Sequence, residues 1–380
     1  MKFLIKYGLL PVLFLLGFAM SSDAVRFGFA IDLSVVIVIA CVFYYLFMYK
    51  NRIRDGLSYC WWIYLMVVPT IAMTLLEGGN MQHMILSTCT LMLPFALEPF
   101  VPGNNKQTIR GFYLTFIVST IVLLMYSNFG FLRNWNTNCI AYLIYLGVAG
   151  AAVILAENRK NIVVWVCLFY VFIQLMVTQS RNVISALVIV ILLVMFKNIF
   201  SKRTPYGIIC GAAILYPVIF PIITKQIAGT STYTVLRRIL ESAFEKDGVF
   251  SGRDSLFPLA EFILKKSLFN NIFGYGNSMT NVLSVHNDYY MIRYAYGIIG
   301  TIIIGVLLGA FFKKAYVLIQ KGDNITFGCV AVLIGVLYQQ ASEGWFLASP
   351  LVILMAFVYM AVVIKRYRMS EGKHLKNENA

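Results

Sequence analysis

The sequence predicts an all-α polytopic membrane protein with about 12 transmembrane helices and one long outer loop that carries amphipathic helices. Composition is the first reason: 60% of the 380 residues are apolar and only 12% are charged, with a mean hydropathy of +0.79. A soluble globular protein is typically about half apolar and a quarter charged, so that class is excluded, as are disordered and collagen-like chains. The recurrence of long apolar stretches and the distribution of basic residues between them are the other two reasons.

The apolar stretches are long enough to cross a bilayer, whose hydrocarbon core of about 30 Å needs roughly 20 residues of helix. Twelve of them are predicted to be transmembrane helices: 3–20, 29–49, 57–76, 82–101, 111–127, 138–156, 162–178, 182–198, 206–224, 294–312, 325–341 and 350–364. The first begins with basic residues, as a signal peptide does, but residues 20–23 (Met-Ser-Ser-Asp) form a poor cleavage site and another span follows at once. We therefore expect an uncleaved anchor.

The basic residues are concentrated in the connections on one side of the predicted helices and so set the orientation. One set of connections, with the tail, holds 20 of the 31 lysines and arginines: Lys2, Lys6, Lys50, Arg52, Arg54, Lys106, Arg110, Arg159, Lys160, Lys197, Lys202, Arg203, Lys313, Lys314, Lys321, Lys365, Arg366, Arg368, Lys373 and Lys376. The opposite short connections hold only Arg26, Arg133 and Arg181. Because basic connections remain in the cytoplasm, both termini are predicted to be cytoplasmic. The other eight lie in one long segment, which is exempt from this rule.

That long segment divides the chain. Residues 1–224 hold predicted helices 1–9, residues 225–293 form the outer loop, residues 294–364 hold helices 10–12, and residues 365–380 form a cytoplasmic tail expected to fray from residue 369. The net charge of +15 follows mainly from this topology, so a nucleic-acid partner is not implied. All seven cysteines fall in apolar stretches, which favours small core residues over a disulfide framework.

Two segments of the outer loop have the spacing of amphipathic helices, 234–244 and 255–266. Pro258 falls in the first turn of the second predicted helix, where proline is tolerated. Helices of this kind lie on a membrane surface or roof a cavity. From Asn287 onward, the pattern predicts a helix that runs straight into the span at 294–312.

The end of the loop holds two candidate functional residues, His286 and Arg293. On the predicted helix they would lie two turns apart on one face, about 10 Å from each other. An imidazole can take a proton from a hydroxyl near neutral pH, and a guanidinium can hold a phosphate through two parallel hydrogen bonds. The alternative for His286 is a helix cap or a residue at a wet interface.

Two further arginines on the outer side are candidates. Arg181 lies in a tight turn between two short spans, where the alternative is that it snorkels to lipid headgroups. Arg253 lies between the two amphipathic segments, where the alternative is an ordinary surface pair with Asp247 or Asp254.

Ionisable residues within the spans are scarce: Asp32, His83 and Glu98, with Glu343 near an outer helix end. A charge at the bilayer centre costs at least about 2.5 kcal/mol, so ion-coupled carriers retain such groups for transport. No span is built around a buried acidic pair. The sequence also has no phosphate-binding lysine loop, paired-cysteine zinc motif or GxSxG motif, and its three histidines are widely separated, so no metal site is predicted.

Four short motifs, taken in order, carry a resemblance to a known family. They are Ser180-Arg181 at an outer turn, Ser251-Gly252-Arg253 in the long loop, Gly274-Tyr275-Gly276, and His286-Asn287 ahead of a span with Gly297 and Gly300. Together with the topology, they resemble the bacterial O-antigen polymerase and O-antigen ligase superfamily. The motifs cover about 180–300, whereas the topology fits nearly the whole chain.

The resemblance implies a membrane glycosyltransferase of the bacterial inner membrane that acts at the periplasmic face. Its donor would be an oligosaccharide on undecaprenyl diphosphate, with no nucleotide sugar, metal ion or other cofactor. His286 would act as the base or position the acceptor hydroxyl, and Arg181 and Arg253 would hold the diphosphate. We add Arg293 to the diphosphate site from its spacing alone. Asn287 and Tyr275 are taken as substrate-binding residues, the tyrosine by stacking on a sugar ring.

Our first prediction is therefore an O-antigen polymerase, which joins repeat units into a polysaccharide. The O-antigen ligase, which transfers polymer to lipid A-core, would have nearly the same site and remains an alternative. A lipid-linked oligosaccharide flippase is less favoured, because it should have two related halves, a basic central cavity and no long outer loop. The expected partners are the lipid-linked oligosaccharide, membrane lipids, a chain-length regulator and a flippase.

Overall fold

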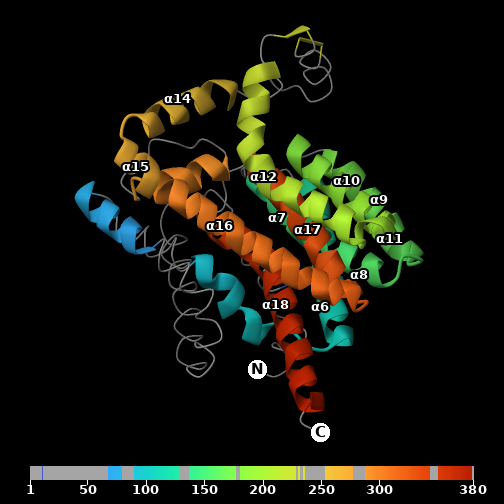
Figure 1. Ribbon diagram of the computed structural model, residues 1–380. Coiled ribbons are helices and arrows are strands. Elements are labelled where there is room, and N and C mark those ends of the chain that lie inside the picture. Colours follow the sequence, from blue (N-terminus) through green and yellow to red (C-terminus); the bar gives the residue numbers. More distant parts are fainter. Residues whose placement is uncertain are drawn as a thin grey trace.

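The computed structural model describes residues 11, 67–78, 90–128, 137–176, 180–227, 230–231, 234–235, 253–276, 287–342 and 350–378, and every structural statement below concerns these residues. They form helices and connecting turns (Figure 1), as expected of the predicted all-α class. The predicted spans at 3–20 and 29–49 lie outside the described residues, apart from the single residue 11.

The described helices overlap the predicted apolar stretches, although several of them begin or end well outside the predicted bounds and the stretch at 138–156 is divided between two helices. They are Val67–Leu76, Thr90–Phe100 (which ends in the 3-10 helix η2, Glu98–Phe100), α6 (Asn105–Asn128), α7 (Thr137–Val148), α8 (Gly150–Glu157), α9 (Ile162–Met176), α10 (Arg181–Met195), α11 (Lys197–Phe200), α12 (Arg203–Ile227), α14 (Arg253–Lys265), α15 (Leu268–Phe273), α16 (Asp288–Gln320), α17 (Asn324–Gln340) and α18 (Pro350–Glu378).

Three of these helices are long and apolar enough to cross a membrane: Asn105–Met125 within α6, Arg203–Ile227 and Asp288–Gln320. They indicate a multi-pass membrane protein. The described part of the chain also has shorter apolar helices of 10–17 residues, such as Ile162–Met176 and Asn324–Gln340.

The bundle has two ends, which we name by the residues that lie there. The basic end holds the starts of α6, α12 and α17 and the end of α16, and α18 extends from it toward the C-terminus (Figure 1). The loop end holds the end of α12, the starts of α10 and α16, and the end of α17.

Helix α17 lies at the centre of the bundle and is buried along most of its length, because glycines let its neighbours approach closely. A Cβ atom at Gly328 would lie 2.5 Å from the Cα atom of Val153 in α8, and one at Gly335 would collide with the hydroxyl of Tyr145. That hydroxyl donates a hydrogen bond to the carbonyl of Val332 at 3.0 Å. Close packing of this kind stabilises helix bundles in lipid, where apolar burial alone gives little preference for association.

Two long helices are irregular near the loop end. Helix α12 contains Pro217 and Pro221, each of which removes a backbone donor from the helix. Helix α16 is interrupted at Gly297, whose φ of 69° and ψ of −170° are not helical. The prediction of a helix running straight from residue 287 into the span is therefore wrong, because the helix is broken there.

Two other predicted details also change. Helix α14 begins at Arg253, so Pro258 lies in its second turn and not in its first. Helix α18 continues to Glu378, so the tail does not fray from residue 369. Of the other amphipathic segment, 234–244, only residues 234–235 are described.

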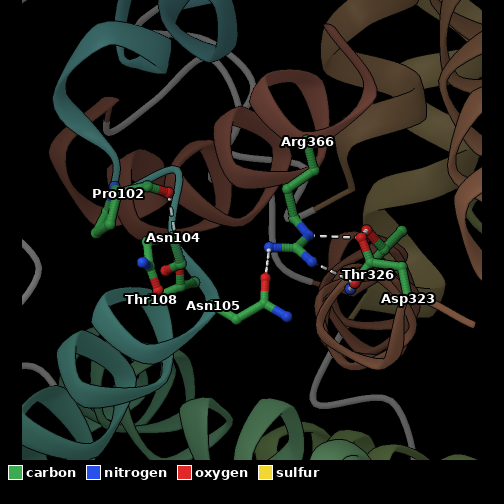
Figure 2. Close-up of polar contacts among 7 residues, drawn as sticks. All are labelled: Pro102, Asn104, Asn105, Thr108, Asp323, Thr326 and Arg366. Atoms are coloured by element: carbon green, nitrogen blue, oxygen red, sulfur yellow. Dashed lines mark hydrogen bonds and ion pairs between the residues drawn. The ribbon is translucent and has the colours of Figure 1, made fainter. Parts of the chain in front are cut away.

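At the basic end, Arg366 joins α6, α17 and α18 (Figure 2). Its Nε donates to Oδ2 of Asp323 at 2.5 Å and its Nη2 donates to Oδ1 of the same carboxylate at 2.8 Å. Its Nη1 donates to the carboxamide oxygen of Asn105 at 2.9 Å. Asp323 also caps α17 by accepting a hydrogen bond from the backbone N–H of Thr326. The two charged side chains are only 11% and 12% exposed, so this is a largely desolvated, bidentate ion pair.

Other basic side chains at this end are also bound within the protein. The ammonium of Lys197 donates to the carbonyl of Ala156 at 3.0 Å and to the carboxamide of Asn324. Arg368 forms an ion pair with Glu98. Glu98, one of the few carboxylates in the predicted spans, is 4% exposed and is neutralised by this arginine instead of reaching water. Ion pairs and hydrogen bonds of these basic side chains therefore join the helices at the basic end.

Candidate functional site

A long apolar groove of about 880 Å³ runs between α16 and its neighbours α12, α17, α18 and the segment Thr90–Phe100. Most of its lining is aliphatic or aromatic, for example Ile214 of α12, Leu307 of α16 and Met360 of α18. Because it is lined both by residue 288 at the start of α16 and by residue 314 near its end, the groove follows most of the length of this helix. Its volume is at the upper end of the range for small-molecule sites, and its lining suits a lipid chain.

The loop end of the groove lies at the start of α16. Pro217, Asp288, Tyr289 and Gln340 line it. Asp288 is only 3% exposed, although it is a carboxylate in the first turn of the helix. A carboxylate is favoured in this position by the helix dipole.

Arg293 lies one turn further along α16 and is held by neutral oxygens. Its Nε and Nη2 both donate to the carboxamide oxygen of Asn271 in α15, at 3.2 and 2.8 Å, and its Nη1 donates to the hydroxyl of Tyr289 at 3.1 Å. The guanidinium carbon is 5.8 Å from the centroid of the Tyr289 ring. Within the described part of the chain, no carboxylate pairs with this arginine, so the described residues fix its orientation without neutralising its charge. Tyr289 connects it to the groove.

Asn287 fixes the start of α16. Its side-chain oxygen accepts the N–H of Tyr290 and caps the helix, while its Nδ2 donates to the carbonyl of Pro217 at 3.1 Å and to the carbonyl of Ala341 at 2.7 Å. The residue is fully buried. Both amide hydrogens are therefore used within the protein, and the structure gives Asn287 a positioning role between α12, α16 and α17. Its predicted contact with substrate remains a prediction.

An aromatic cluster packs α14 onto α16 beside this arginine. Tyr275 stacks on Tyr294 with ring centroids 4.8 Å apart, and its hydroxyl donates to the carbonyl of Ile263 at 3.0 Å. Burial raises the pKa of Tyr275 against the lowering effect of its hydrogen bond with Asn270, and nearby Glu77 adds to the increase, so the phenol remains a neutral donor. Tyr275 is only 5% exposed, which makes its ring part of the packing. Its stacking on a sugar remains a prediction.

The glycines of the motifs allow backbones to touch in this cluster. Gly274 has a φ of 87°, and a Cβ there would lie 2.3 Å from the carbonyl oxygen of Ala295. A Cβ at Gly297 would lie 2.1 Å from the carbonyl oxygen of Ile272. The backbone at the end of α15 therefore contacts the backbone of α16 at its break. The N–H of Tyr275 also donates to the carbonyl of residue 294 at 2.7 Å. This contact holds Asn271, and therefore Arg293, in place.

The structure locates the other predicted residues only in part. Arg181 begins α10 at the loop end, the same end as Arg293. Arg253 begins α14, and its side chain is outside the described part of the structure. His286 also lies outside the described residues. Because α16 begins at Asp288, the two-turn helical spacing assumed between His286 and Arg293 is not a feature of this helix.

Three residues at this site were missed by reasoning from the sequence. Asp288 directly follows the quoted His286-Asn287 motif, but its burial in the lining of the groove has no signal in the sequence. Asn271 and Glu261 belong to the loop helices, and they reach Arg293 and Tyr290, respectively, only in the folded chain; the hydroxyl of Tyr290 donates to Glu261 at 3.0 Å. Loop residues whose partners are distant in sequence are difficult to identify from periodicity alone.

Comparison with protein-family models gives no match, and comparison with curated proteins finds no similar sequence. Among the described residues, no three histidine, cysteine, aspartate or glutamate side chains gather as a metal site would require. Any functional conclusion therefore depends on the geometry of the loop end: an apolar groove, an oriented arginine that pairs with no described carboxylate, and a buried carboxylate at one end of the groove.

Proposed function

We propose that the protein is a glycosyltransferase of the bacterial inner membrane that joins lipid-linked oligosaccharide repeat units into a polysaccharide, as an O-antigen polymerase does. The observation that carries the proposal is the position of Arg293 beside the loop end of the apolar groove, where it donates a hydrogen bond to the hydroxyl of the lining residue Tyr289. A sugar linked to a lipid through a diphosphate needs an apolar surface for its chain and a cation for its diphosphate. At the described loop end, the groove would supply the apolar surface and Arg293 would supply the cation.

The reaction assigned to this site is the attack of an acceptor hydroxyl on the anomeric carbon of the donor. A new glycosidic C–O bond forms, the bond from the anomeric carbon to the diphosphate oxygen breaks, and the lipid diphosphate leaves with the bonding electrons. Arg293 would stabilise the negative charge that develops on the leaving group, with Arg181 and Arg253 as further candidates. The proton of the hydroxyl would pass to His286, which precedes the Asn287 cap.

The proposed orientation follows from the distribution of charge. The basic end would face the cytoplasm and the loop end the periplasm, with about 12 spans and both termini cytoplasmic. The gathering of bonded lysines and arginines at one end of the described bundle supports this arrangement. Lipid-linked donors would then reach the site from the membrane itself.

The test is a lipopolysaccharide gel of the source strain lacking this gene, complemented with wild type, Arg293→Gln, His286→Ala or Lys313→Gln. Lys313 is an exposed lysine on the same helix, and it controls for the loss of one positive charge. We expect the deletion to leave core carrying one repeat unit without a ladder. Arg293→Gln should reduce polymer formation about 100-fold, His286→Ala should match the deletion, and Lys313→Gln should restore the ladder.

Other outcomes are equally informative. Core without any repeat unit, together with accumulated lipid-linked polymer, would identify a ligase. A normal ladder in the deletion strain would overturn both glycosyltransferase assignments. Full activity of Arg293→Gln at normal protein level would remove this arginine from the site.

A further inference from the structure

The short helix α15 has its polar side chains turned toward the protein and its apolar side chains turned outward. Leu268 and Phe269 are 76% and 54% exposed. Asn270 is only 8% exposed and donates to a carboxylate oxygen of Glu77 at 3.1 Å, and Asn271 accepts two hydrogen bonds from the guanidinium on α16. A surface helix in water has the opposite arrangement, with its apolar face on the core and its polar face outward. The arrangement in α15 is that of a helix whose outer surroundings are apolar.

Helix α14 is apolar on two faces. One face, with Phe257 and Leu264, is buried, and the ring of Phe257 stacks on that of Tyr290 in α16 with centroids 5.6 Å apart. The other face holds Leu259 and Phe262, and Phe262 is 61% exposed. Packing on α16 therefore accounts for only one of the two apolar faces, and an exposed apolar patch of this kind marks a surface that contacts lipid or another protein.

The end of the helix Val67–Leu76 lies beside α15 and extends this apolar surface. The hydrogen bond between Asn270 and Glu77 joins the two segments. Leu75 and Leu76, which directly precede this glutamate, are both exposed. Apolar outer surfaces from two distant parts of the sequence thus lie together at the loop end.

The same surface continues along α16, which is long and apolar enough to cross a membrane (Figure 1). The close approach of the carbonyl of Ile272 to the backbone at Gly297 places α15 at the break in α16. Beyond this break, Ile298 and Val306 of α16 are exposed, as the outward side chains of a transmembrane helix are. Helix α15 therefore lies at the end of a surface that faces lipid, and lipid is the apolar phase closest to its outward side chains.

We propose that α15 and the outward face of α14 are embedded in the lipid leaflet at the loop end, with Phe262, Leu268 and Phe269 in contact with acyl chains. Lys265 and Lys266, both exposed at the end of α14, then extend to the headgroup layer, as lysines beside an apolar phase do. These loop helices are thus part of the membrane-embedded structure and not a cap in water. The inference does not depend on the proposed function, because it rests on the exposure of side chains and not on any substrate.

The experiment measures tryptophan fluorescence of the purified full-length protein in lipid nanodiscs. Phe262→Trp and Leu268→Trp each place an indole on the patch, and the emission of wild type, which has 5 tryptophans, is subtracted. Val306→Trp, on the exposed side of α16, is the control for lipid contact. Ser231→Trp, at an exposed polar position beyond the end of α12, is the control for contact with water. The two quenchers are phosphatidylcholine brominated on its acyl chains and iodide in the buffer.

We expect brominated lipid to quench the added emission of Phe262→Trp and Leu268→Trp as strongly as that of Val306→Trp, and about threefold more strongly than that of Ser231→Trp. Iodide should quench Ser231→Trp best. Quenching of both patch variants by iodide and not by bromine would overturn the proposal, because the patch would then face water. Resistance to both quenchers would also overturn it, because another protein surface, such as a second copy of the chain, would then cover the patch.

Discussion

The two ends of the bundle hold their arginines in different ways. At the basic end, Arg366 pairs with the carboxylate of Asp323, and Arg368 pairs with Glu98. At the loop end, Arg293 is held by the carboxamide of Asn271 and the hydroxyl of Tyr289, which are neutral. Both arrangements orient a guanidinium, but among the described residues only the first also neutralises it.

This difference separates a charge used for structure from one that remains available for a ligand. A largely desolvated ion pair gives geometric definition, and breaking it is costly because a buried charge is left behind. A guanidinium held by neutral acceptors retains its attraction for a diphosphate. If this distinction is correct, substitutions at the basic end should mainly reduce stability, whereas removal of the Arg293 charge should mainly reduce activity.

The largest effect on stability is expected from Gly297→Ala, which tests the backbone contact beneath the loop-end site. The new Cβ would meet the carbonyl of Ile272 at 2.1 Å, and alanine disfavours a φ of 69°. We expect a loss of about 4 kcal/mol, seen as little monodisperse protein after detergent extraction. Gly309→Ala, on the same helix in open space, should be extracted like wild type. Normal yield of Gly297→Ala would show that α15 does not rest on this break.

Asn287→Ala should cost about 3 kcal/mol, because it removes a helix cap and leaves the carbonyls of Pro217 and Ala341 without their donor. The midpoint of thermal unfolding measures this loss. Asn287→Ser keeps a capping oxygen but cannot span both carbonyls, so it should recover only part of the stability. Full recovery by serine would mean that the two carbonyl contacts contribute nothing.

Arg366→Met should lower stability by about 2 kcal/mol, since Asp323 is left largely buried without its partner. Activity per folded molecule should remain unchanged. The matched loop-end variant, Arg293→Met, should cost only about 1 kcal/mol while polymer formation is lost. Thermal unfolding and polymer yield, measured on the same preparations, give both values. Loss of polymer formation in Arg366→Met together with unchanged polymer formation in Arg293→Met would contradict the distinction between the two ends.

The smallest effect concerns the pH dependence of stability through Lys197. Burial lowers the pKa of Lys197, and Arg159 lowers it further, against the opposing effects of Glu157 and Asp323. Between the lowered folded value and the unfolded value of about 10.4, the unfolded chain binds more protons, so stability should rise with pH in that window.

Lys197→Gln should reduce this rise, as measured by the unfolding midpoint at successive alkaline pH values. Lys313→Gln, at an exposed position, is the matched control and should retain the wild-type slope. An identical slope in Lys197→Gln would contradict the assignment of the effect to Lys197.

Much of the fold was predictable because transmembrane helices are encoded locally. A run of apolar residues predicts a helix wherever it stands, and α9 and α17 lie almost where the apolar stretches at 162–178 and 325–341 predict them. The glycine motif around Gly274 was also visible, although its physical reason, a backbone contact with Ala295, was not. Arg293 was added to the candidate site from its helical spacing to His286, but α16 begins only at Asp288, and the role of Arg293 stays a prediction.

The sequence by itself thus determined the helical class and most helix positions, together with the separation of basic residues. Only the tertiary structure decided that Glu98 is neutralised by Arg368, that Asn287 joins three helices, and that residues as distant as Leu91 and Glu371 line one groove. The physical reason is that lipid and protein interior are equally apolar. The hydropathy of a transmembrane helix therefore reveals its existence but not the face that packs, and the partners of its few polar residues depend on that face.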